Sequence, residues 1–98
     1  MRLNYHPDAE AELIEAALFY ERRLPTLGAQ FLDAADCAVR ALQEAPERYR
    51  IIEADVRRCL MPRFPYAIYY MAASDHLRIL AFKHHSRHPE CWRYRLSE

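Results

Sequence analysis

The chain has 98 residues, of which 52% are hydrophobic, and its formal net charge at pH 7 is zero. This length predicts one domain over residues 1–98, since domains run from about 50 to 250 residues. The single glycine excludes the glycine-rich phosphate-binding loops of nucleotide-binding folds. The sequence has no long apolar run, so we expect neither a membrane span nor a secretory leader, and we expect a cytoplasmic location.

The three cysteines are widely spaced and form no C-x-x-C pair. An odd number of cysteines in a short chain argues against a disulfide framework and favours free thiols. His84, His88 and Cys91 have spacings that a metal site could use. However, Pro89 disfavours a helix before it, and no second Cys or His pair lies at zinc-finger spacing. We therefore expect no metal ion and no cofactor.

The neutral total hides an asymmetry along the chain. Residues 1–47 carry four arginines against nine acidic residues, a net charge of −5. Residues 48–98 carry nine arginines and Lys83 against five acidic residues, a net charge of +5. Arginine presents a planar fork of donors that suits carboxylates, phosphates and base edges. The pattern indicates either one anion-binding face or charges that alternate over solvated surfaces.

Two amphipathic helices are expected in the first half. Pro7 suits the first turn of a helix that runs to about Leu24. Residues 25–28 break this helix and begin a second one, which ends near Ala45 because Pro46 cannot continue it. So short a link makes the two helices antiparallel neighbours, an αα-hairpin. Their apolar stripes are Ala9, Leu13, Ala16, Ala17, Tyr20 and Leu24 in the first helix, and Leu27, Phe31, Ala34, Ala35, Ala38, Val39 and Leu42 in the second.

Strands flank this hairpin in the sequence. Residues 2–5 alternate polar and apolar side chains, as a short strand does. After the second helix the hydrophobic period changes from 3.6 to 2 residues, and this change can begin at residues 51–52. Strands are predicted at 56–61, 64–71 and 76–82. Tight turns join these three as an antiparallel meander. The face expected to form the core of the middle strand carries Phe64, Tyr66, Ile68 and Tyr70, and Tyr69 lies on the other face.

These elements predict an α+β fold in two layers. The order is β-α-α-β-β-β, with the helical hairpin packed on one face of the sheet. A short helical tail follows the last strand and runs through Trp92.

Two segments carry a family resemblance. Residues 57–70 read RRCLMPRFPYAIYY, and residues 81–95 read AFKHHSRHPECWRYR. Together with the acidic first helix and Leu27-Gly28-x-x-Phe31, they resemble the RelE/ParE superfamily of toxins from type II toxin–antitoxin systems, also called plasmid stabilisation proteins. The resemblance covers essentially the whole chain. His85 and His88 depart from the residues that are common in the family at those positions.

The resemblance implies a small toxin that is silenced by an antitoxin encoded beside it, as a homodimer or as a heterotetramer with the antitoxin. ParE-like members bind DNA gyrase, whereas RelE-like members cleave messenger RNA in the ribosome with a lysine-rich cluster. This chain has a single lysine, Lys83, so it looks closer to the ParE-like branch, without an enzymatic activity of its own. An inactive homologue that only binds its partner is a further alternative.

The basic tail is the segment predicted to bind the target. Between residues 83 and 95, four fixed cations stand against one acid, a charge that suits an acidic protein surface or a nucleic acid. The predicted target-binding residues are Arg87, Trp92, Arg93 and Arg95. An RNA-cleaving toxin would instead need cations at the phosphorane and proton carriers beside it. The candidates for that chemistry are Arg58, Arg63, His84, Arg87 and Tyr94.

The tail also has a purely structural interpretation. A tryptophan after a proline in a short tail commonly packs on a sheet edge, and Arg87 could stack on the ring of Trp92. His84 would then hydrogen-bond within this clasp. The two interpretations are compatible if the clasp orders the tail that binds the target.

Overall fold

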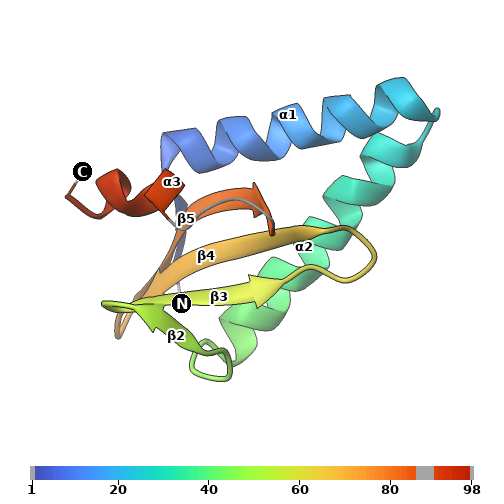
Figure 1. Cartoon of the computed structure of the whole chain (residues 1–98). Helices are drawn as coiled ribbons and strands as arrows, with labels where there is room; N and C mark the ends of the chain where they lie inside the picture. The colour runs from blue at the N-terminus through green and yellow to red at the C-terminus, as the bar shows by residue number, and fades with distance from the viewer. Residues whose placement is uncertain (1, 86–89, 98) are drawn as a thin grey trace.

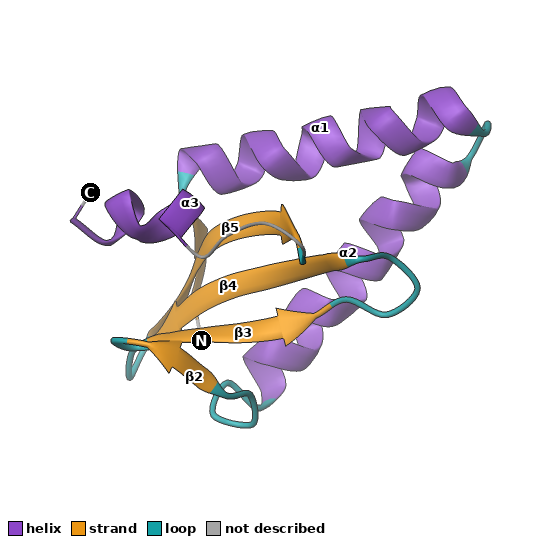
Figure 2. Cartoon of the chain, in the orientation of Figure 1, coloured by secondary structure: helices purple, strands orange, loops and turns teal. Residues whose placement is uncertain are grey.

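The computed structural model describes residues 2–85 and 90–97. Within them, five strands form one sheet in the order β1-β5-β4-β3-β2. The strands are β1 (Arg2–Tyr5), β2 (Ile51–Glu53), β3 (Val56–Leu60), β4 (Tyr66–Ala72) and β5 (His76–His84). Helices α1 (Pro7–Arg23) and α2 (Leu27–Glu44) form the hairpin, and α3 (Glu90–Arg93) and the 3-10 helix η1 (Tyr94–Ser97) form the tail (Figure 1, Figure 2).

The α+β fold class is confirmed, and the sheet has two features beyond the expectation. β2 is a separate strand, and the antiparallel meander therefore runs from β2 to β5. β1 joins β5 in parallel, with Arg2 opposite His76 and Tyr5 opposite Ile79. The sheet is mixed because the long connection between β1 and β5 returns the chain in the same direction.

Helix α1 begins as predicted and ends one residue earlier than expected. Nδ1 of His6 accepts a hydrogen bond of 3.0 Å from the backbone N–H of Asp8, and Pro7 occupies the first turn. The prediction that Leu24 belongs to the apolar stripe is wrong. The backbone of this residue is extended and its side chain is 56% exposed, because the helix has already ended at Arg23. No helix in the described part of the chain is long and apolar enough to cross a bilayer.

The turn between the helices is closed by one carboxylate. Glu21 accepts hydrogen bonds from the backbone N–H groups of Thr26 (3.0 Å) and Gly28 (2.9 Å), which satisfies two donors at the start of α2. A Cβ atom on Gly28 would lie 2.5 Å from the carbonyl oxygen of Ala17. The glycine is therefore required for the close approach of the two helices.

Gly28→Ala is expected to lower the free energy of unfolding by about 1–3 kcal/mol, because the added methyl group overlaps a backbone oxygen. This outweighs the roughly 1 kcal/mol by which alanine favours a helix over glycine. Asp33→Ala, at an exposed position of the same helix, is the control and should lose no stability. Urea denaturation measures both variants, and an unchanged midpoint for Gly28→Ala would contradict the close packing.

Two hydrophobic clusters lie on the two faces of the sheet. The larger one is between the sheet and the hairpin and includes Phe31, Leu42, Ile68, Tyr70 and Phe82. The smaller one is on the opposite face and consists of Val56, Ala67, Tyr69, Leu80, Ala81 and Trp92. The alternation predicted for β4 is confirmed, since Ile68 and Tyr70 face the helices and Tyr69 faces away from them.

Candidate functional site

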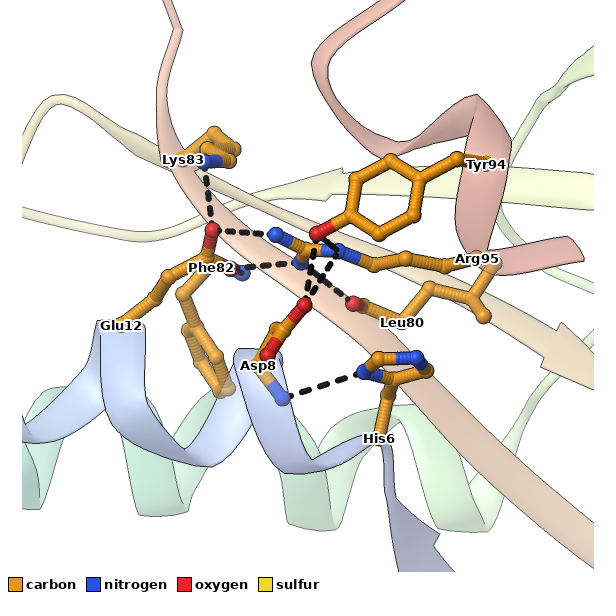
Figure 3. Close-up of polar contacts among 8 residues, drawn as sticks. All are labelled: His6, Asp8, Glu12, Leu80, Phe82, Lys83, Tyr94 and Arg95. Carbon is orange, nitrogen blue, oxygen red and sulfur yellow. Dashed lines mark hydrogen bonds and ion pairs between the residues drawn. The ribbon is translucent and has the colours of Figure 1, made fainter. Parts of the chain in front are cut away.

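Arg95 joins the C-terminal tail to α1 and β5. Its side chain is buried, at 4% exposure. Nη1 and Nη2 donate hydrogen bonds to Oε1 (2.8 Å) and Oε2 (2.7 Å) of Glu12, and Nη1 also donates to the carbonyl oxygen of Leu80 at 2.8 Å (Figure 3). The ammonium group of Lys83 contacts the same carboxylate. One carboxylate on α1 therefore holds two cations, one from β5 and one from the tail.

The charges of this cluster are fixed by its hydrogen bonds. Burial acts to raise the pKa of Glu12, but the hydrogen bonds from Arg95 and Lys83 outweigh it and hold the pKa below its ordinary value. The hydrogen bond to Glu12 raises the pKa of the Arg95 guanidinium. Glu12 and Arg95 are thus both ionised at neutral pH, and the contact is a largely buried salt bridge.

A second carboxylate on α1 also binds the tail. The hydroxyl group of Tyr94 donates to Oδ2 of Asp8 at 2.6 Å, and this hydrogen bond lowers the pKa of Asp8. Nε of Arg95 donates to the Tyr94 hydroxyl oxygen at 3.1 Å (Figure 3). Asp8 and Glu12 are four residues apart, so they lie on one face of the helix. That spacing was visible in the sequence, but nothing in it indicated that the tail returns to this face.

The same cluster covers a free strand edge. β1 ends at Tyr5, opposite Ile79, so no strand of the described residues pairs with the edge of β5 beyond Ile79. There the carbonyl oxygen of Leu80 accepts from Arg95, and the backbone N–H of Phe82 donates to Oε1 of Glu12 at 3.2 Å. These side chains satisfy backbone groups that would otherwise offer an edge for strand pairing.

Of the residues predicted to bind the target, Trp92 and Arg95 are buried. Trp92 is fully buried, and its ring lies 5.3 Å from that of Tyr69, centroid to centroid. It packs on the sheet face opposite the hairpin, rather than on the sheet edge that a clasp was expected to use. Arg93 is exposed, and its Nε and Nη2 donate to Glu53 on β2, both at 2.6 Å. Target binding by this set stays a prediction, and Arg87 lies outside the described residues.

The residues that an RNA-cleaving toxin would use are spread over the molecule. Arg58 lies opposite Tyr69, and His84 lies opposite Tyr66, in the registers of β3 and β5 with β4. Tyr66 packs against the helix-side cluster and Tyr69 belongs to the cluster on the other face. Directly opposed residues share a face of the sheet, so Arg58 and His84 leave opposite faces.

The other two described candidates for RNA cleavage, Arg63 and Tyr94, each bind a different helix. Arg63 donates to Oε1 of Gln30 on α2 at 2.8 Å, and Tyr94 binds Asp8 at the start of α1. Within residues 2–85 and 90–97, these side chains do not surround one position that a reacting group could occupy. In the same part of the chain, no three His, Cys, Asp or Glu side chains come together to hold a metal ion.

A hollow of about 460 Å³ lies between α1 and the end of β5. Its lining includes Lys83 and His84 on the strand and Leu18 and Phe19 on the helix. Ile14, Leu18 and Phe19 are 51%, 50% and 44% exposed, and we call these three side chains the apolar face of α1. Three large apolar side chains exposed beside a hollow are typical of a surface that another molecule covers.

The model of the ParE toxin of type II toxin–antitoxin systems, parDE, matches residues 3–89 of the chain. The chain belongs to the ParE toxin family. The match confirms the family resemblance, and it contains residues 57–70, the part of the second motif up to residue 89, both long helices, strands β2 to β5 and all of β1 except Arg2. The tail helices α3 and η1 of this ParE-family chain lie beyond the matched residues.

A solved structure shows the same fold. A chain of the chromosomal ParDE TA system from P. aeruginosa matches with a TM-score of 0.77 and 20% sequence identity. The match covers 86% of the present ParE-family chain and 95% of that chain. No curated protein sequence matches significantly.

Proposed function

We propose that this ParE-family toxin arrests growth by binding DNA gyrase and that a cognate antitoxin neutralises it. The observation that carries the proposal is the match of the ParE toxin family over residues 3–89. The toxin acts by binding rather than by cleavage, with one contact to the antitoxin and another to the target.

Action by binding is supported by the positions of the polar residues. General acid–base cleavage needs a proton carrier within hydrogen-bond reach of the reacting group and a cation on the same phosphate. His84 and Arg58 leave opposite faces of the sheet, so one phosphodiester cannot contact both of them. A toxin of this geometry is better suited to occupying a target surface than to breaking a bond.

The antitoxin contact is supported by the apolar face of α1. These side chains are exposed on the first helix of the hairpin, and the adjoining hollow offers a concave surface for a helical or extended segment. Burial of this surface would stabilise the complex mainly through the hydrophobic effect, which salt does not screen. The related fold in P. aeruginosa comes from a ParDE system, which supports a ParD-like antitoxin as the partner.

Induction of the wild-type chain alone is expected to arrest growth, with filamentous cells, a DNA-damage response and intact messenger RNA. Growth is followed by optical density, cell shape by microscopy and RNA by gel electrophoresis. Co-expression of the antitoxin from the neighbouring gene should restore growth. Rapid loss of messenger RNA would favour a RelE-type nuclease, and normal growth without an antitoxin would favour an inactive homologue.

In the same assay, Arg93→Gln is expected to weaken growth arrest, because Arg93 is an exposed cation in the described part of the tail that we assign to the target. Glu53→Gln is the matched control, since it breaks the same ion pair and leaves the arginine in place. Both substitutions should cost little stability, since an exposed pair contributes about 0–1 kcal/mol. Equal loss of toxicity in the two variants would show that Arg93 acts only by holding the tail on β2.

A further inference from the structure

Three arginines line a hollow at the β2 edge of the sheet. This edge is the one furthest from α1 (Figure 1). The hollow is lined by Arg48, Tyr49, Arg50, Ile52, Arg58 and Leu60. Within residues 2–85 and 90–97, none of these three arginines forms an ion pair with a carboxylate. Glu53, the acid of β2, binds Arg93 instead.

Two of these arginines are held side by side by the register of the sheet. Ile51 is opposite Arg57, so Arg50 and Arg58 are direct cross-strand neighbours, and the N–H of Arg58 donates to the carbonyl oxygen of Arg50 at 3.2 Å. Direct neighbours on antiparallel strands point to the same face, and like charges at such a pair destabilise a sheet. An anion lying between the two guanidinium groups would relieve that repulsion.

We infer that this hollow, which we call the arginine hollow, binds a single-stranded nucleic acid. Guanidinium groups pair with phosphate oxygens through two parallel hydrogen bonds, and three of them surround one small concavity. The rest of the lining is apolar or aromatic, with Leu60 58% exposed, and provides a surface for the face of an unstacked base. A duplex keeps its bases stacked inside, so only a single strand can place one there.

The shape of the edge argues against an acidic peptide as the occupant. An extended peptide would gain most of its binding energy by pairing with the edge of β2. However, β2 has only three residues, and its register with β3 shifts between Ile51 and Glu53. Short and irregular edge strands are poor templates for a further strand. The hollow therefore offers side-chain contacts to anions rather than a ladder of backbone hydrogen bonds.

This inference goes beyond the proposed function, because it requires neither gyrase nor an antitoxin. The test is fluorescence anisotropy of a short labelled DNA or RNA single strand with the purified full-length chain. Arg50→Gln/Arg58→Gln should weaken binding by on the order of tenfold at low salt. The slope of log K against log salt should fall by about 1.4, since each phosphate contact on a single strand contributes about 0.7.

Arg22→Gln/Arg23→Gln on α1 is the matched control. It removes the same charge from two exposed positions and should retain wild-type affinity. The arginine-hollow variant should melt at or above the wild-type temperature, since it removes two adjacent like charges. If it fails to fold, Arg48→Gln in the loop before β2 makes the same test. Equal weakening in the α1 control, or binding of polyglutamate but of no oligonucleotide, would overturn the inference.

Discussion

Glu12→Gln is expected to lower the free energy of unfolding by about 3 kcal/mol, because it leaves the buried Arg95 guanidinium without its nearest carboxylate partner. The amide is the same size as the carboxylate, but its NH₂ group faces the donors of Arg95 and Lys83. A small domain has only about 5–10 kcal/mol of stability in total, so this loss would be easily visible. Thermal and urea denaturation give the value directly.

The control for this prediction is the exposed pair between Asp36 and Arg40 on α2, whose side chains are 59% and 72% exposed. Asp36→Asn should cost at most about 0.5 kcal/mol, because exposed pairs four residues apart on a helix contribute about 0.3–0.5 kcal/mol. A double-mutant cycle with Glu12→Gln and Arg95→Gln isolates the coupling between the two side chains. A loss below about 1 kcal/mol for Glu12→Gln would show that the salt bridge does not hold the tail.

The same pair predicts a pH dependence. The pKa of Glu12 is lower in the folded chain than its unfolded value of about 4.3. Its contribution to stability is therefore fully present above that unfolded value and is lost as the pH falls through the lower folded pKa. The difference in stability between the wild type and Glu12→Gln should accordingly be constant near neutral pH and shrink in acid.

Trp92→Ala is expected to cost about 3–5 kcal/mol, the range for removing a large buried aromatic side chain. The indole ring fills the cluster on the sheet face away from the hairpin, against Tyr69 and Leu80. Its loss leaves a cavity there and releases α3 from the sheet. Leu96→Ala, which removes a side chain that is 37% exposed, is the control in the same tail and should cost less than about 1 kcal/mol.

Trp92→Phe separates ring volume from the indole N–H group. Nε1 of Trp92 is buried and has no hydrogen-bond partner among the described residues. An unpaired buried donor costs about 1–3 kcal/mol, so its removal should offset much of the volume lost on going to phenylalanine. We expect a loss well below that of the alanine variant. Equal losses would indicate that the N–H group has a partner and that the tail is held partly through it.

The helices and the faces of β4 could be predicted because their signals are local. Pro7 and Pro46 mark helix ends, and the periods of 3.6 and 2 assign side chains to faces without any knowledge of the partner. The contact of Glu12 with Arg95 could not be predicted in this way. The two residues are 83 positions apart, and they meet only because the tail crosses back over β5.

The arginine hollow could not be predicted from the sequence for a similar reason. Arg58 was identified as a candidate cation, but its neighbour depends on the register of a strand that the sequence marked only by residues 51–52. Once β2 pairs with β3, Arg50 and Arg58 become neighbours on one face. Register is a tertiary property, so the charge pattern along the chain could not show which arginines gather.

The parallel pairing of β1 with β5 sets an order on the folding of this chain during synthesis. The hairpin of α1 and α2 involves a continuous early stretch of sequence and can form while later residues are still being added. β1 leaves the ribosome before the other strands but must wait for β5, as shown by the hydrogen bond that Arg78 donates to Asn4, 74 positions earlier. Contacts of such separation form late because they close a long loop. A cell translating this chain therefore holds no complete sheet until β5 has been released from the ribosome, and no docked tail until η1 has followed it.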